Sequence, residues 1–90
     1  MARLVRITGR VHGVGYRDWL LREAQSQGLA GWVRNRSDGT VEALLSGELP
    51  AVQAVLLACR RGPPLALVET VEEKLAEDPA EPGFRRLPTL

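Results

Sequence analysis

In this chain of 90 residues, the strongest candidate for a binding or catalytic site is the segment from Gly9 to Arg17, which reads GRVHGVGYR. Its glycines, Gly13 and Gly15, permit backbone angles at which successive N–H groups converge on an anion. Arg17, in the first turn of the helix expected next, could add a bidentate contact to phosphate oxygens, and the helix N-terminus adds partial positive charge. The spacing matches neither a Walker A loop nor a dinucleotide fingerprint, so a plain tight connection is the alternative.

Few groups for covalent or metal-assisted catalysis accompany this segment. The only histidine, His12, and the only cysteine, Cys59, are far apart in sequence, so no metal-ligand cluster is recognisable. Cys59 falls on the apolar face of an expected helix, which favours a buried structural thiol over a nucleophile. No Ser/His/Asp arrangement is apparent. What is left can bind an anion, or accelerate a reaction that needs only positioning and charge stabilisation.

One class of substrate suits such a site. A phosphate ester leaves as an alkoxide and needs a general acid or a metal ion. An acyl phosphate leaves as a carboxylate, whose conjugate acid has a pKa of about 4, so no proton donor is required. Water would then be the attacking group. A regulatory domain that binds an anion without turnover would use the same groups, and it is the alternative to an enzyme.

Hydrophobic periodicity predicts the elements that must position these residues. Strands are expected at residues 3–9, 30–36, 40–46, 65–73 and 84–87, and helices at 16–27 and 50–61. Asp38-Gly39 predicts a hairpin turn, and Val71, out of phase with Val68, suggests a bulge. The order βαββαβ plus a short edge strand predicts one α+β domain over residues 1–90. Its fold would be a ferredoxin-like split βαβ sandwich, with two helices on one face of an antiparallel sheet.

The composition limits the classes of partner that this protein is expected to bind. The net charge is +1, which argues against strong nonspecific nucleic-acid binding. The first 36 residues hold seven arginines against two acidic residues, an imbalance that can steer a small anion. An RNA-recognition domain has the same topology but stacks bases on sheet aromatics, and Trp32 is the only good candidate here. The absence of a long apolar run, of a signal-peptide pattern and of a second cysteine favours a cytoplasmic protein away from membranes.

Three stretches resemble the acylphosphatase family. They are GRVHGVGYR from Gly9, GLAGWVRNRSDGTVEA from Gly28 and GPPLALV from Gly62, and the layout of the whole chain follows that of the family. The resemblance implies the ferredoxin-like fold, hydrolysis of a small-molecule acyl phosphate, and no cofactor or metal. It also implies a site that accepts phosphate or sulfate, and we expect a monomer.

The resemblance also assigns roles to residues. It implies that Arg17 binds the substrate phosphate and that Asn35, on the adjacent strand, orients the water. The cradle would be completed by the backbone of His12, Gly13, Val14, Gly15 and Tyr16. By itself, an asparagine just before a hairpin turn is more often a residue that forms local hydrogen bonds. The family commonly has glutamine where this chain has His12, a change expected to be nearly silent if only the backbone N–H acts there.

Overall fold

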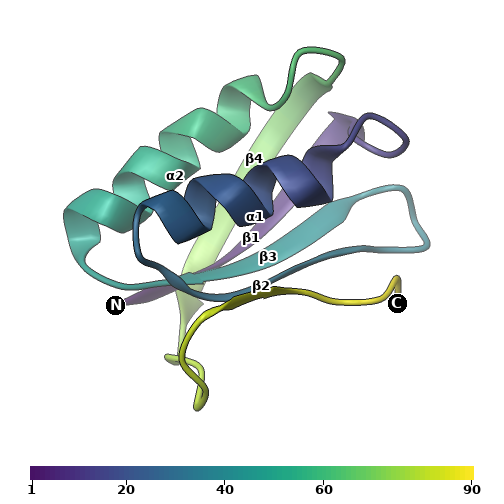
Figure 1. Ribbon diagram of the computed structural model, residues 1–90. Helices are drawn as coiled ribbons and strands as arrows, with labels where there is room; N and C mark the ends of the chain where they lie inside the picture. Colours follow the sequence, from purple (N-terminus) through teal and green to yellow (C-terminus); the bar gives the residue numbers. More distant parts are fainter.

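The computed structural model describes residues 1–90 as one mixed sheet covered on one face by two helices (Figure 1). The elements, in chain order, are β1 (Ala2–Arg10), α1 (Tyr16–Ser26), β2 (Ala30–Asn35), β3 (Val41–Ser46), α2 (Leu49–Arg61), β4 (Leu67–Ala76) and β5 (Phe84–Arg86). The strand order is β4-β1-β3-β2-β5. The predicted ferredoxin-like arrangement is confirmed. None of the helices is long and apolar enough to cross a membrane.

The core lies between the helices and the sheet, and the periodicity of the sequence explains it. In α1 the buried residues Tyr16, Leu20 and Ala24 recur every four positions, so they form one stripe facing the sheet. The matching stripe of α2 includes Val52, and its C-terminal turn contributes Cys59. The inward side chains of the central strands complete a single cluster of 17 buried residues.

The last two strands differ from the prediction. The fourth strand begins at Leu67 and extends to Ala76, whereas residues 65–73 were expected. Its C-terminal half, residues 72–76, is mostly charged and exposed. The length of the strand is therefore set by pairing with β1 and not by alternation of buried and exposed side chains. β5 lies at an edge, as predicted, but it runs parallel to β2, so the sheet is mixed and not purely antiparallel.

The predicted bulge is present in β4. Thr8 of β1 is opposite Thr70, while Gly9 is opposite Val68, which leaves Glu69 as the extra residue. The insertion places both Val68 and Val71 against the core although they are three residues apart.

Candidate active site

Arg17 and Asn35 line the same small cavity, of about 120 Å³. Gly13, Gly15 and Tyr16 also line it, together with Val11, Asp18 and Arg86. The cavity therefore gathers the loop after β1, the start of α1, the end of β2 and the edge strand β5. Three larger depressions lie elsewhere, on the open sheet face, beside α2 and at the turn that follows α2, and none of them includes a residue of the loop between β1 and α1.

The loop between β1 and α1, residues 11–15, is called the glycine loop here, and it has the backbone conformation expected of an anion cradle. Gly13 and Gly15 adopt positive φ angles of 71° and 79°, which other residues rarely accept. Gly15 is the N-cap of α1 and offers no side chain to the first turn. The first N–H groups of the helix therefore have no side-chain cap, and their partial positive charge faces the loop.

Arg17 and Asn35 are the two polar side chains of the cavity that form no hydrogen bond or ion pair with another residue. Arg17 lies in the first turn of α1 and is half-buried. Asn35 is the last residue of β2 and, like the buried Val33 two positions before it, faces the helical side of the sheet. Its backbone carbonyl accepts a hydrogen bond from the N–H of Leu90 at 3.1 Å, so the strand end is held while the amide is free.

Tyr16 anchors the start of α1 to the end of α2. Its ring is 1% exposed, and its hydroxyl donates a hydrogen bond of 2.7 Å to the backbone carbonyl of Cys59. In a continuing helix that carbonyl would accept the N–H of residue 63, which is Pro63 and has none. Tyr16 thus supplies the missing donor. Burial, chiefly, raises the pKa of its hydroxyl above the ordinary value, so the group stays protonated in the folded protein.

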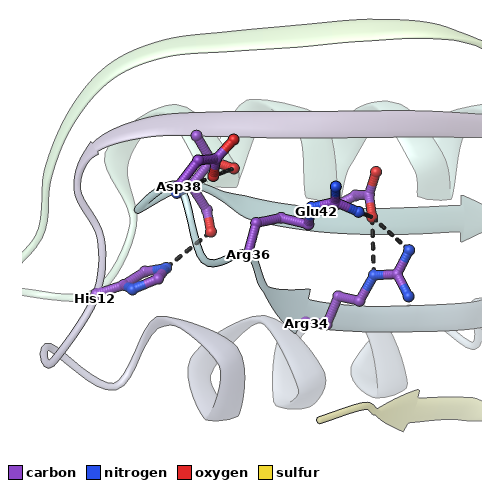
Figure 2. A network of polar contacts seen from close by, with 6 residues as sticks. His12, Arg34, Arg36, Asp38 and Glu42 are labelled. Carbon is purple, nitrogen blue, oxygen red and sulfur yellow. Dashed lines mark hydrogen bonds and ion pairs between the residues drawn. The ribbon is translucent and has the colours of Figure 1, made fainter. Parts of the chain in front are cut away.

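His12 joins the loop to the β2–β3 hairpin. Its Nε2 lies 2.8 Å from the carbonyl oxygen of Thr40, which requires a hydrogen on Nε2 (Figure 2). Thr40 is itself fixed, because its N–H and hydroxyl both donate to Asp38, at 3.0 and 2.7 Å. The side chain at position 12 therefore has a contact of its own, which sequence patterns gave no means of predicting. Neither His12 nor Val14 lines the cavity.

The open face of the sheet carries a separate polar network. Arg34 and Arg36 both reach Glu42, at 2.8 and 3.4 Å (Figure 2). Arg34 precedes Asn35 in β2, so its side chain points to the opposite face of the sheet. The guanidinium of Arg34 covers the ring of Trp32, 4.6 Å from its centroid. The only aromatic ring suited to stacking a base is thus occupied by a neighbour, which is evidence against the RNA-recognition alternative.

Two cavity residues were not predicted to be part of the site. Arg86 of β5 and Asp18 of α1 form an ion pair at the cavity, and their side chains are 42% and 52% exposed. Asp18 was visible as an acidic residue in the first helical turn. Its partner was not, because the pairing depends on the position and direction of β5, which the sequence did not reveal.

Cys59 is fully buried on the inner face of α2, as predicted. Burial raises the pKa of its thiol to about 12. No group of three or more His, Cys, Asp or Glu side chains is placed to hold a metal ion. The cavity can therefore offer cationic and N–H donors to an anion from this chain's own residues, with one free amide beside them.

Comparison with known proteins gives a consistent result. The family model described as Acylphosphatase matches residues 4–86. An acylphosphatase of Acidiphilium cryptum is 58% identical over 93% of this chain and 92% of its own length. One of Rhodospirillum rubrum is 54% identical over 97% of this chain and 96% of its own. The crystal structure of acylphosphatase from Bacillus subtilis superposes with a TM-score of 0.90 at 34% identity, covering 97% of this chain and 99% of that one.

Proposed function

Since the chain belongs to the acylphosphatase family, and is thus a hydrolase that converts acyl phosphates to carboxylate and inorganic phosphate, we propose which of its residues perform each step. The phosphoryl group binds in the loop from His12 to Tyr16 and against the guanidinium of Arg17. Asn35 orients the attacking water. The observation that carries this assignment is the shared cavity in which both side chains lack any protein partner.

The cradle neutralises charge and fixes position. The loop N–H groups and the N-terminus of α1 present several donors to the phosphoryl oxygens, with Gly13 and Gly15 allowing the close approach. Arg17 adds a fork of donors and a full positive charge. Because the loop N–H groups belong to the folded backbone before substrate arrives, little reorganisation of these donors opposes the reaction as charge redistributes on the phosphoryl oxygens.

Asn35 lies at the end of β2, on the same face of the sheet as the cradle, and β3 separates that strand from β1, so it is not the adjacent strand expected from the sequence. Its amide can accept a hydrogen bond from water through the oxygen and donate one to a phosphoryl oxygen through the nitrogen. That combination holds the water in line with the bond that breaks, which converts a bimolecular encounter into a positioned attack.

The proton balance follows from the substrate. Water attacks phosphorus, the bond from phosphorus to the carboxylate oxygen breaks, and the carboxylate departs unprotonated because its conjugate acid has a pKa of about 4. The proton from water passes to a phosphoryl oxygen of the substrate. Asp18, the one carboxylate at the cavity, is held by Arg86 and is not assigned a role as base.

The wider proposal concerns the state in which the enzyme works. We propose that residues 1–90 form one domain, that it acts as a monomer in the cytoplasm, and that inorganic phosphate or sulfate occupies the cradle in competition with substrate. The elements that line the cavity pack on one continuous core, which supports the single domain. Analytical ultracentrifugation with and without phosphate measures the oligomeric state, and a stable dimer would contradict it.

The test of the residue roles uses benzoyl phosphate in excess chelator, with p-nitrophenyl phosphate as the control substrate. Arg17→Ala should raise KM and lower kcat together, because it removes both binding and charge stabilisation. Asn35→Ala should lower kcat by about two to three orders of magnitude with a smaller change in KM, as expected for one positioning group. Undiminished turnover by Asn35→Ala would show that another group orients the water.

A further inference from the structure

Arg86 lies on the same side of the sheet as the catalytic groups. In the parallel pairing of β5 with β2, Arg86 is opposite Val33 and Phe84 is opposite Gly31. Val33 and Phe84 are both buried, which places Arg86 on the helical face as well. Arg86 lines the cavity shared by Arg17 and Asn35, whereas its neighbour Arg85 pairs with Glu81 and does not line it.

The guanidinium of Arg86 has donors to spare. An arginine carries five N–H donors, and Arg86 uses one nitrogen, Nη1, on Asp18 Oδ1. The other donors have no protein partner, and the side chain is 42% exposed. Asp18 thus fixes the guanidinium at the rim of the cavity without using it up. Asp18 also brings a negative charge to a cavity that binds anions, so it opposes the binding that Arg86 favours.

We propose that Arg86 is a second anion-binding residue of this site, and that Asp18 both holds it in place and reduces its effect on the substrate. The inference rests on the proposed function, because it assumes that the phosphoryl group occupies the cavity at Arg17. An acyl phosphate bound there meets two guanidinium groups, one from α1 and one from β5. The acid at position 18 adjusts the net charge that the substrate encounters.

The experiment measures the Ki of inorganic phosphate and the KM of benzoyl phosphate at low ionic strength, where charge effects are least screened. Arg86→Ala should raise both constants about tenfold, close to the low end for a charged hydrogen bond, since the site is open to solvent. Asp18→Asn should lower both. Arg85→Ala is the matched control: it removes the same charge from the same strand, outside the cavity, and should change neither constant by more than about twofold.

The double variant Asp18→Asn/Arg86→Ala tests whether Arg86 contacts the bound anion or only neutralises the negative charge of Asp18. If Arg86 binds the anion, this variant has weaker phosphate inhibition than Asp18→Asn alone. Equal inhibition by the two would show that Arg86 only masks Asp18, and it would overturn the inference. Arg86→Ala with wild-type Ki and KM would overturn it as well.

Arg17→Ala separates this inference from the proposed function. If Arg17→Ala loses phosphate inhibition while Arg86→Ala keeps it, only the role of Arg86 fails. If Arg17→Ala keeps it, the anion binds elsewhere and both proposals fail. Thermal melting of each variant monitors the fold, which should be little affected because exposed ion pairs contribute little to stability.

Discussion

Replacing Tyr16 by phenylalanine removes one buried hydroxyl and leaves the carbonyl of Cys59 without a donor. The hydrogen bond is 2.7 Å long, both residues are at most 1% exposed, and Pro63 has no N–H to take over. An unpaired buried acceptor costs about 1–3 kcal/mol, and near-complete exclusion of water favours the middle of this range. We therefore expect Tyr16→Phe to lower the free energy of unfolding by about 2 kcal/mol, or the melting temperature by roughly 8–16 °C.

The same hydroxyl gives the prediction a pH dependence. Burial raises the pKa of folded Tyr16 above its ordinary value of 10.0, whereas the unfolded chain retains that ordinary value. Below pH 10 the group is neutral in both states and its contribution is constant. Above pH 10 only the unfolded chain loses the proton, so the stability of the wild type falls by about 1.4 kcal/mol per pH unit. Tyr16→Phe lacks this loss, and the gap between the two proteins should narrow by about 1.4 kcal/mol between pH 9 and 11.

Urea unfolding at pH 7, 9 and 11 measures the gap. Tyr16 is the only tyrosine in the chain, so tyrosinate absorbance reports on this one group without interference. Ionisation of Cys59 in the unfolded state affects both proteins equally and cancels from the difference. A variant within 0.5 kcal/mol of wild type at pH 7, or a gap that stays constant up to pH 11, would refute this reasoning.

Three further predictions concern other named contacts. His12→Ala should raise the Ki of phosphate about fivefold, the equivalent of one ordinary hydrogen bond, because the loop loses its contact with Thr40. His12→Gln, whose amide can donate to the same carbonyl, should restore the wild-type Ki. Equal Ki values for the two variants would show that the hydrogen bond to Thr40 does not contribute to phosphate binding. Cys59, buried and with its pKa raised to about 12, should resist iodoacetamide at pH 8 in the native protein and react in denaturant; rapid native labelling would contradict the burial. The hydroxyl of Ser46 and the N-terminal amine hold the pKa of Asp78 below its ordinary 3.8, so its stabilisation is present above that pH and is lost as the pH falls; urea unfolding should show Asp78→Asn less stable than wild type at pH 7, with the difference closing toward pH 3.

Local patterns in the sequence were sufficient for the helices, the hairpin and the bulge. The stripe of Tyr16, Leu20 and Ala24 specifies a helix face wherever the helix packs, and Asp38-Gly39 specifies a turn through its own backbone preferences. The extra residue in β4 was visible because Val68 and Val71 are out of phase. These features depend on neighbours in sequence, so they can be predicted without knowledge of the fold.

Features set by distant pairing were not predictable in this way. The mostly charged C-terminal half of β4 has no alternation, and only the register with β1 determines where the strand ends. The direction of β5 depends on the path of the preceding loop, and with it the placement of Arg86 beside Asp18. The hydroxyl of Tyr16 and the ring of His12 likewise have partners at distant positions in the chain. The roles of Arg17 and Asn35 stay predictions, supported by their common cavity.

The placement of the cavity has a kinetic consequence. Its wall joins the turn after the first strand to the final strand, and the pair of Asp18 and Arg86 spans 68 positions of the chain. Contacts between residues so far apart in sequence form late in folding, because the chain loses the entropy of closing a long loop before it gains the energy of the contact. A refolding chain should thus recover helical circular dichroism before it recovers full affinity for phosphate. The refolding time at which phosphate binding returns would then report when the last strand docks, so phosphate inhibition measured during refolding would follow the final step of folding.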